Sequence, residues 1–290
     1  MQGETNRYDF SRKAELKLTS NYAAETRLRR VEGRHNPLLK EVRKAFAHAQ
    51  CTEDGYCAIE GLHIVEEAVR SGLKFRAALF SDSAATLAKR LLPQFGAHVE
   101  TAILPDKIFA GVVPSETPQG VAALVRFKAF SLEDVLSRAQ AGALVAIAGV
   151  QDPGNLGTIL RSAEAFEAGG ILLGEGTASH FNSKTIRASA GSVFRLPIVK
   201  AALTENLRAT LGQGIRLIAT SSHKGTALPD AKLTGPLAIF VGNEGSGLSR
   251  DLLKQMDEIV VIPHSSKVES LNAGVAASLV LYEAARQRDF

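Results

Sequence analysis

The stretch IPHSSKVESLNAGVAASLVLYEAARQ, Ile262 to Gln287, joins the end of an apolar segment to a polar loop and then to a helix rich in small residues. Two earlier stretches have a similar layout: DPGNLGTILRSAEAFEAGG, Asp152 to Gly170, and FVGNEGSGLS, Phe240 to Ser249. Each is preceded by a run of apolar residues that predicts a buried strand. Polar residues at the ends of strands in an α/β chain lie where ligands usually bind, so these three stretches form the candidate site.

The second half of the chain alternates short apolar runs with stretches that predict helices. The runs are rich in Val, Ile and Leu, as the strands of a parallel sheet covered on both faces require. This pattern predicts an α/β domain with a doubly wound parallel sheet. The expected strands are ALVAIAGV, GGILLG, FRLPIV, IRLIATS, LAIFVG and EIVVIP, and the expected helices lie near residues 156–168, 183–190, 204–212, 249–255 and 271–286.

The first half predicts a second, smaller α/β domain, because a chain of 290 residues is long for one hydrophobic core. A linking helix over residues 131–140 is expected to join the two domains. In the first domain, helices are expected in HNPLLKEVRKAFAHA, in LHIVEEAVRSG and over residues 83–92, and strands in YCAIEG, FRAALFS, AHVETAI and GVAALVRF.

Composition indicates a globular protein without a membrane segment. Hydrophobic residues make up 45% of the chain, which is ordinary for a globular domain. No apolar run approaches the ~18 residues of a membrane span, and MQGETNRYDFSRKAELK lacks the apolar segment of a secretory signal. We therefore expect a cytoplasmic protein.

The cysteines and histidines do not predict a metal site. Cys51 and Cys57 flank TEDGY and have no Cys or His pair elsewhere at zinc-ligand spacing, and the seven histidines are scattered. We expect both cysteines to be reduced and structural, and we expect no metal.

Positive charge is concentrated near the N-terminus. The formal net charge is only +4, but residues 12–44 carry ten lysines and arginines against four acids. Such a cluster favours a polyanion such as RNA, because binding releases counterions. A solvated basic tail and helix face is the alternative interpretation.

The three quoted stretches resemble the sequence motifs of the SpoU (TrmH-like) RNA ribose 2′-O-methyltransferases of the SPOUT superfamily. Between the first two, SHFNSKTIRASAGSVFRLPIV resembles the family's NPKxVRASAG stretch, in which Arg187 and Arg195 are candidate phosphate contacts or structural ion pairs. PSETPQGVAALV and the order of elements before it resemble the substrate-binding domain that precedes the catalytic domain in many SpoU enzymes.

The resemblance implies a domain plan and an assembly. It implies a basic tail over residues 1–23, an RNA substrate-binding domain over residues 24–128 and a SPOUT methyltransferase domain over residues 129–290. The C-terminal part of that last domain would be threaded into a deep trefoil knot, an exception to the rule that chains do not knot. The family acts as homodimers, which implies that Arg161 of one subunit completes a site with the cofactor loop of the other.

The resemblance also assigns candidate catalytic residues. Arg161 would hold a phosphate or stabilise a developing alkoxide, although some accounts of the family make it the general base. Asn155 would hold Arg161 or the substrate, with a helix N-cap as the alternative. Glu244 would act beside Arg161 or the methyl-transfer centre. Ser270 and Asn272 would lie beside the ribose or the methionine part of the cofactor; otherwise Ser270 is an N-cap and Asn272 a first-turn residue.

S-adenosylmethionine is the cofactor that the resemblance implies. Gly242 would meet its adenosine through main-chain groups, and Ile262 and Leu271 would hold the adenine in an apolar slot. Thr220 and Ser221, which follow IRLIA, would face the cofactor from another strand end.

A few positions depart from the usual family pattern. His264 stands where methionine is common, Ser266 where glycine is common, and Ala273-Gly274 where Val-Ser or Val-Ala is frequent. The polar candidates are retained.

The predicted function is methylation of a ribose 2′-hydroxyl, with 23S-type ribosomal RNA as the expected substrate and transfer RNA as the alternative. A catalytically silent RNA-binding or ribosome assembly protein on the same fold is the alternative function. A base-nitrogen methyltransferase is disfavoured, because the Asn/Arg and SLN segments belong to the ribose-directed branch. A dinucleotide site is disfavoured because no GxGxxG follows the first strand.

Overall fold

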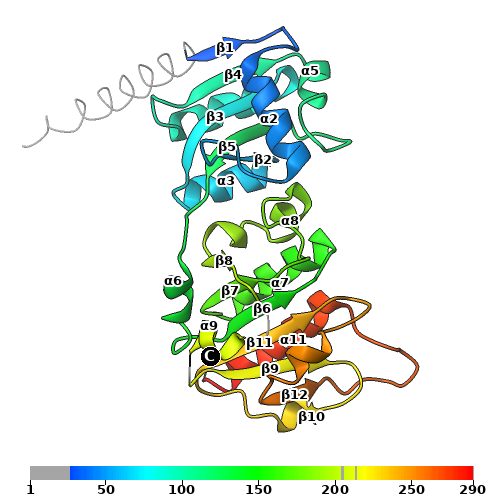
Figure 1. Cartoon of the computed structure of the whole chain (residues 1–290). Helices are drawn as coiled ribbons and strands as arrows, with labels where there is room; N and C mark the ends of the chain where they lie inside the picture. The colour runs from blue at the N-terminus through cyan, green and yellow to red at the C-terminus, as the bar shows by residue number, and fades with distance from the viewer. Residues whose placement is uncertain (1–26, 204–205, 213, 290) are drawn as a thin grey trace, which may run out of the picture. The chain divides into compact units, whose positions relative to one another are not determined.

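The computed structural model describes residues 27–203, 206–212 and 214–289 (Figure 1). The basic tail expected over residues 1–23 lies outside the described residues. The chain divides into two compact units, Met1–Phe127 and Lys128–Phe290. Both units combine helices with a sheet, so the predicted α/β class is confirmed.

The first unit contains a five-stranded mixed sheet with the order β1-β4-β3-β5-β2. β4 lies parallel to β1 and β3, whereas β5 lies antiparallel to β2 and β3. The sequence analysis missed β1, because its residues LRR show no apolar alternation. The strands are β1 (Leu28–Arg30), β2 (Cys57–Glu60), β3 (Lys74–Ser81), β4 (Glu100–Leu104) and β5 (Val121–Arg126). The helices are α2 (Pro37–His48), α3 (Leu62–Arg70), α4 (Ala85–Leu91) and α5 (Asp106–Ala110), with short 3₁₀ turns η1 (Asp82–Ala84) and η2 (Leu92–Gln94).

Helix α2 forms where the sequence predicts it. The side chain of Asn36 accepts a hydrogen bond from Leu38 N at 2.9 Å, and Pro37 occupies the first helical position, where its missing N–H is not needed. The helix buries Leu39 and Val42 in the core of the unit. A polar cap and an apolar face therefore fix both the start and the packing of this helix.

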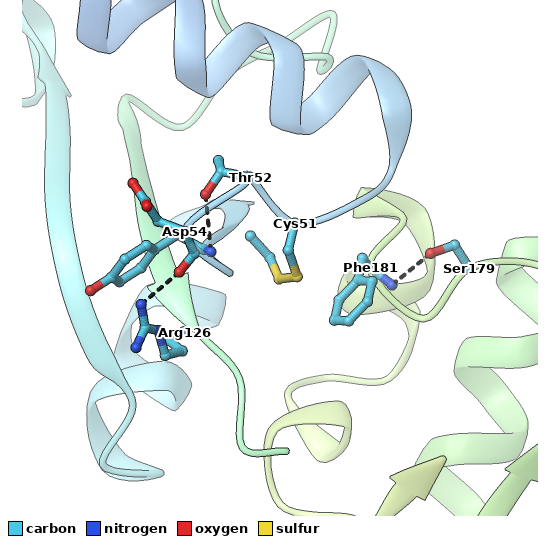
Figure 2. Close-up of a disulfide and its surroundings, with 8 residues drawn as sticks. Cys51, Thr52, Asp54, Arg126, Ser179 and Phe181 are labelled. Carbon is cyan, nitrogen blue, oxygen red and sulfur yellow. Dashed lines mark hydrogen bonds between the residues drawn. A yellow bond between two sulfur atoms is a disulfide. The ribbon is translucent and has the colours of Figure 1, made fainter. Parts of the chain in front are cut away.

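The two cysteines form a disulfide, so the prediction that they are reduced is wrong (Figure 2). The backbone between them folds into a tight turn, in which Thr52 N donates to Tyr56 O at 2.7 Å and Gly55 N donates to Thr52 O at 2.8 Å. Gly55 has a φ of +76°, a conformation that favours glycine. The turn brings the Cα atoms of Cys51 and Cys57 to 4.3 Å, a closeness that sequence spacing alone did not reveal.

Part of the basic cluster is paired with acids of the same unit. Arg29 Nη2 lies 2.6 Å from Glu100 Oε1, and Arg30 Nη1 lies 2.8 Å from Asp82 Oδ1. These pairs lower the positive charge that this surface presents. They favour the solvated-face interpretation for these two arginines.

The second unit contains a seven-stranded sheet in which all strands are parallel, with the order β10-β12-β9-β11-β6-β7-β8. Its central strands are almost fully buried, as their Val-, Ile- and Leu-rich sequences predict. The strands are β6 (Leu144–Ala148), β7 (Gly170–Leu173), β8 (Ile198–Lys200), β9 (Arg216–Ser221), β10 (Thr226–Ala227), β11 (Leu237–Gly242) and β12 (Glu258–Val261). The helices are α6 (Leu132–Leu136), α7 (Pro153–Ala165), α8 (Ser183–Ala188), α9 (Leu207–Leu211), α10 (Arg250–Leu253) and α11 (Ala273–Arg286), with 3₁₀ turns η3 (Ser192–Phe194) and η4 (Leu228–Asp230).

Three elements differ from the sequence expectation. The linking helix α6 begins at a capping box formed by Ser131 and Asp134, but it ends at Leu136, because the backbone then tightens into i→i+3 turns. The run FRLPIV forms only the short strand β8, because Phe194 is buried within η3. The two-residue strand β10 is too short to predict from its sequence.

Small residues let α7, α8 and α11 approach one another closely. A Cβ atom added at Gly157 of α7 would lie 2.4 Å from the Cβ of Ala188, and one added at Gly274 of α11 would lie 3.0 Å from the Cβ of Thr158. Helix α11, red in Figure 1, thus packs against α7 without room for a larger side chain. The trefoil knot stays a prediction of the family resemblance.

Among the residues that the structure describes, no helix has the length and apolar character needed to cross a membrane. The same described ranges contain no group of three His, Cys, Asp or Glu side chains placed to hold a metal ion.

Replacing Gly157 with alanine should lower the free energy of unfolding by about 1–3 kcal/mol, because the added methyl group overlaps α8. The overlap must outweigh the gain of up to ~1 kcal/mol that alanine brings to a helix. Urea unfolding measures the difference. Gly33→Ala is the control, since no atom lies within 4 Å of its added Cβ. A Gly157→Ala protein more stable than the parent would mean that α7 and α8 are less tightly packed than described.

Candidate functional site

Three neighbouring strands bring candidate residues to one edge of the second sheet. β9 lies between β12 and β11. In-register pairing places Ser221 of β9 beside Val261 of β12, so Ile262 follows at the same edge. The pairing of β9 with β11 places Gly242 level with Ser221. Since parallel strands in register end together, residues far apart in sequence meet here.

A chain of hydrogen bonds joins the three motifs at this edge. Asn155 Nδ2 donates to Glu244 Oε1 at 3.0 Å, and Asn272 Nδ2 donates to Asn155 Oδ1 at 2.8 Å. Asn272 Oδ1 in turn accepts from the backbone N–H groups of Gly274 at 2.9 Å and Val275 at 3.2 Å. We call this set the Glu244–Asn155–Asn272 chain. It connects the loop after β11 with the starts of α7 and α11.

Glu244 acts within this chain as an acceptor. Its two carboxylate oxygens also accept from the backbone N–H groups of Gln151 and Asp152, each at 3.3 Å. Partial burial raises the pKa of Glu244, but the hydrogen bonds from Asn155 and from backbone N–H groups outweigh it and hold the pKa below its usual value. A carboxylate with a lowered pKa is a weak base, so Glu244 is better suited to holding its neighbours in position than to removing a proton.

The side chains that cap α7 and α11 are not the ones that the sequence suggested. Asp152 caps α7, because its Oδ1 accepts from Asn155 N at 2.9 Å, so the N-cap alternative for Asn155 is wrong. Asn272 caps α11, so the alternative that made Ser270 the cap is also wrong. The N–H of Asn155 and the ammonium of Lys184, 3.0 Å from Asp152 Oδ2, hold the pKa of Asp152 below its usual value.

Arg161 and Ser270 lie outside the hydrogen-bonded chain. Arg161 is six residues beyond Asn155 on α7, which corresponds to about 9 Å along the helix axis. Its side chain is exposed and forms no hydrogen bond or ion pair within the described part of the chain. Ser270 is also exposed, in the loop before α11. One copy of the chain therefore gathers Asn155, Glu244 and Asn272 but does not add Arg161 to them.

The ends of β9 and β11 are held together closely. Thr220 Oγ1 donates to Phe240 O at 3.0 Å, which links the two strands. A Cβ atom at Gly242 would lie 2.4 Å from the carbonyl carbon of Gly247, so the loop after β11 folds back onto this position. Glycine is required at residue 242 by the fold itself.

Two apolar side chains remain partly exposed in the third motif. Ile262 directly follows β12, and Leu271 directly precedes the cap of α11; both side chains are half-buried. His264 Nδ1 lies 2.8 Å from Ile262 O, so the residue that replaces the usual methionine contacts the backbone of the same loop.

A cavity of about 730 Å³ opens at the carboxyl ends of β6, β7 and β11. Its lining includes Gln151, Glu175, Asn243 and Ser246. Gln151 and Glu175 were not among the residues predicted from the sequence. The available signal was their position, because Glu175 lies two residues past β7 and Gln151 three residues past β6.

The two arginines of the SHFNSKTIRASAGSVFRLPIV stretch differ in their surroundings. Arg195 Nη2 lies 2.9 Å from Glu164 Oε2, and this pairing holds the pKa of Glu164 below its usual value. The structural ion pair is therefore confirmed for Arg195. Arg187 is exposed on α8, and its contact with a phosphate stays a prediction.

Two family models match this chain. Residues 142–282 match the SpoU rRNA Methylase family. Residues 36–123 match the MRM3-like substrate binding domain. The first match covers the first two motifs and residues 262–282 of the third, and the second match lies within the first unit.

Named proteins and solved structures are similar to the chain over most of its length. The 23S rRNA (guanosine(2553)-2′-O)-methyltransferase RlmP of Bacillus subtilis is 31% identical over 255 residues, which are 88% of this chain and 98% of RlmP. The crystal structure of an AdoMet-bound rRNA methyltransferase from Sinorhizobium meliloti has a TM-score of 0.76 and 27% identity, covering 90% of this chain and 98% of that one. The SpoU methyltransferase AviRb from Streptomyces viridochromogenes, in complex with AdoMet, has a TM-score of 0.74 and 28% identity, covering 88% and 99%.

The hydrogen-bonded chain predicts a pH-dependent effect of Asn155→Asp. The new carboxylate cannot donate to Glu244, so two acceptors face each other and the pKa of one of them rises. We expect a loss of about 1 kcal/mol in the free energy of unfolding at pH 7. A raised folded-state pKa lowers the free energy of unfolding as the pH rises from the unfolded-state pKa to the folded-state pKa, so the loss seen at pH 7 should shrink as the pH falls toward 5.

Urea unfolding at several pH values measures this effect. Asn182→Asp is the matched control, because the side chain of Asn182 only accepts, from Lys184 N at 2.8 Å, and an aspartate keeps that bond. Equal behaviour of the two variants across the pH range would contradict the orientation assigned to Asn155.

Proposed function

Because the chain belongs to the SpoU rRNA methylase family, we propose that it methylates a ribose 2′-hydroxyl of ribosomal RNA of the 23S type, with S-adenosylmethionine as methyl donor. RlmP, by its name, methylates a guanosine 2′-oxygen of 23S rRNA, and two structural neighbours hold AdoMet, which is S-adenosylmethionine. The single observation of this structure that supports the proposal is the Glu244–Asn155–Asn272 chain beside the strand ends that carry Ser221, Gly242 and Ile262. A ribosomal substrate would place the protein in the cytoplasm.

The residues at the strand ends fit the cofactor. Ile262 and Leu271 present half-buried apolar side chains, which suit the faces of an adenine. Gly242 has no side chain, which lets the loop after β11 fold back onto it, and main-chain groups of this loop would meet the cofactor. Thr220 and Ser221 add hydroxyl groups at the neighbouring strand end, although the Thr220 hydroxyl also binds Phe240 O.

The proposed chemistry divides the work among residues of the chain. S-adenosylmethionine supplies a methyl group on a positively charged sulfur, which an oxygen nucleophile can attack in line. Asn155, held by Glu244 and Asn272, orients the ribose, so positioning provides much of the rate. The guanidinium of Arg161 would stabilise the negative charge that develops on the 2′-oxygen as its proton passes to solvent water. A guanidinium stays protonated at neutral pH, which favours this role over general base.

We propose that α11 forms the centre of a homodimer interface. Val275, Leu279 and Tyr282 are 46%, 39% and 51% exposed, and their spacing places them on one face of the helix. Large apolar side chains that line up on one exposed face usually mark an interaction surface. A second copy of the chain would cover this stripe.

The position of Arg161 supports a role across that interface. Arg161 lies three residues after Thr158, whose side chain contacts the start of α11 at Gly274. It therefore lies near the edge of α7 that faces α11, beside the apolar stripe. From there its exposed side chain can reach a second copy, whereas it makes no bond with the Glu244–Asn155–Asn272 chain of its own copy within the described residues.

Labelled methyl should pass from S-adenosylmethionine to large ribosomal RNA, and the modified linkage should resist alkali because its 2′-oxygen is blocked. Total RNA is separated into large rRNA, small rRNA and tRNA after the reaction. Arg161→Ala should lower the rate by about 10²–10³, as loss of a group that stabilises developing charge does.

Label in tRNA would replace the proposed substrate with the alternative one. Absence of label from all three RNA fractions, with cofactor binding intact, would favour a catalytically silent RNA-binding protein. Alkali-sensitive label would point to a methylated base.

Mixing two inactive variants tests the shared site. Arg161→Ala removes the guanidinium, and Gly242→Val blocks the loop after β11, where even a Cβ atom overlaps Gly247. If subunits exchange randomly, half of the dimers are mixed and each has one intact site, so about a quarter of the parent activity should return. Each variant alone should stay inactive. If circular dichroism and gel filtration show that both variants are folded and form dimers, a mixture no more active than its components would show that every subunit is self-contained.

A further inference from the structure

The cavity of about 730 Å³ lies beside the proposed cofactor residues but is distinct from them. In the strand order β12-β9-β11-β6-β7, the cofactor residues follow β12, β9 and β11, whereas the cavity lies at the ends of β11, β6 and β7. The loop after β11 separates the two. The cavity has the size of a pocket for a small molecule or a single nucleotide.

The polar groups of the cavity do not suit a phosphate. In the part of the chain that the structure describes, its lining includes no lysine, arginine or histidine. Asn243 is fully engaged, because its Nδ2 donates to Gly149 O at 2.8 Å and its Oδ1 accepts from Gly245 N and Ser246 N, each at 3.0 Å. The carboxylate of Glu175 is exposed and has no hydrogen-bond partner among the described residues. A ligand that donates hydrogen bonds would pair this carboxylate.

Apolar surface completes the cavity. Leu203 and Leu252 line it, and both are at least nine-tenths buried in the core of the unit. A flat aromatic ring can pack on such side chains while its edge meets a carboxylate. An apolar wall and a polar group at its edge are features of pockets that bind an unstacked nucleobase.

Among the four RNA bases, guanine fits a lone carboxylate best. An ionised carboxylate only accepts hydrogen bonds, and it accepts two from donors that lie side by side. Guanine presents such a pair, N1–H and the 2-amino group, on its Watson–Crick edge. Adenine and cytosine present one amino group beside an acceptor, and uracil presents one N–H between two acceptors.

We propose that this cavity binds the guanine base of the target nucleotide, with the Glu175 carboxylate accepting from N1–H and the 2-amino group. The assignment rests on the proposed function, because it requires that the target is a nucleotide of RNA. It also explains the place of the cavity. Gln151 lines the cavity, and its backbone N–H donates to Glu244 at 3.3 Å. A base held there would leave its ribose near the Glu244–Asn155–Asn272 chain.

The first experiment identifies the methylated nucleoside. Unmodified ribosomal RNA, transcribed in vitro, is incubated with the full-length protein and labelled S-adenosylmethionine, digested to nucleosides and separated. The inference expects 2′-O-methylguanosine. Label in 2′-O-methyladenosine, -cytidine or -uridine would overturn the inference and leave the proposed function standing. Absence of label would remove the proposed function, and the inference with it.

The second experiment tests the role of Glu175. A short RNA containing the target site is made with guanosine or with inosine, which lacks the 2-amino group. The parent protein should prefer guanosine by about tenfold in kcat/KM, because inosine keeps the N1–H donor but leaves the carboxylate without the bond from the 2-amino group. Glu175→Ala should methylate both RNAs with nearly equal kcat/KM.

Glu133→Ala is the matched control, since Glu133 is an exposed carboxylate on α6 outside the cavity lining. It should keep the preference of the parent. Cofactor binding by Glu175→Ala, measured by calorimetry, should equal that of the parent and show that the variant is folded. An unchanged preference for guanosine in Glu175→Ala would overturn the assignment.

Discussion

The Glu244–Asn155–Asn272 chain is the interaction on which the site depends. Glu244 can only accept, so Asn155 must turn its amide nitrogen toward it. The oxygen of Asn155 then faces Asn272, which must donate with its nitrogen, and this leaves the Asn272 oxygen to cap α11. One carboxylate thereby fixes the orientation of two amides and the start of a helix.

The parallel register of the sheet makes this chain possible. Asn155 and Glu244 are 89 positions apart in sequence, and Asn155 and Asn272 are 117 positions apart. Asn155 and Glu244 meet because they follow β6 and β11, neighbouring strands whose ends coincide. The same register separates two regions at one edge of the sheet. On our proposals, the cofactor binds on the β9 and β12 side, the target base binds on the β6 and β7 side, and the ribose lies between them.

Close packing of α7 against α8 and α11 joins this edge of the sheet to the exposed face of α11. Gly157 lets α7 lie against α8, and Ser162 of α7 and Ser278 of α11 share a hydrogen bond with their oxygens 2.6 Å apart. Helix α11 therefore has two functions in our proposals. Its cap completes the hydrogen-bonded chain, while its exposed apolar stripe meets a second copy. A change in how α11 packs would alter the site and the interface together.

The amino-acid sequence by itself determined the α/β class, the parallel sheet of the second unit and the three motifs that carry the site, because these follow from local periodicity and from residues close together in the chain. Only the tertiary structure decided which residues cap α7 and α11, that Cys51 and Cys57 are joined, and that Glu175 lines a cavity. The local sequence suggested Asn155 as a cap of α7, whereas in the structure Asp152 caps the helix and the Asn155 side chain donates to Glu244, which lies far along the chain. Such contacts depend on strand order and register, and local sequence patterns carry no information about which distant acceptor a side chain will meet.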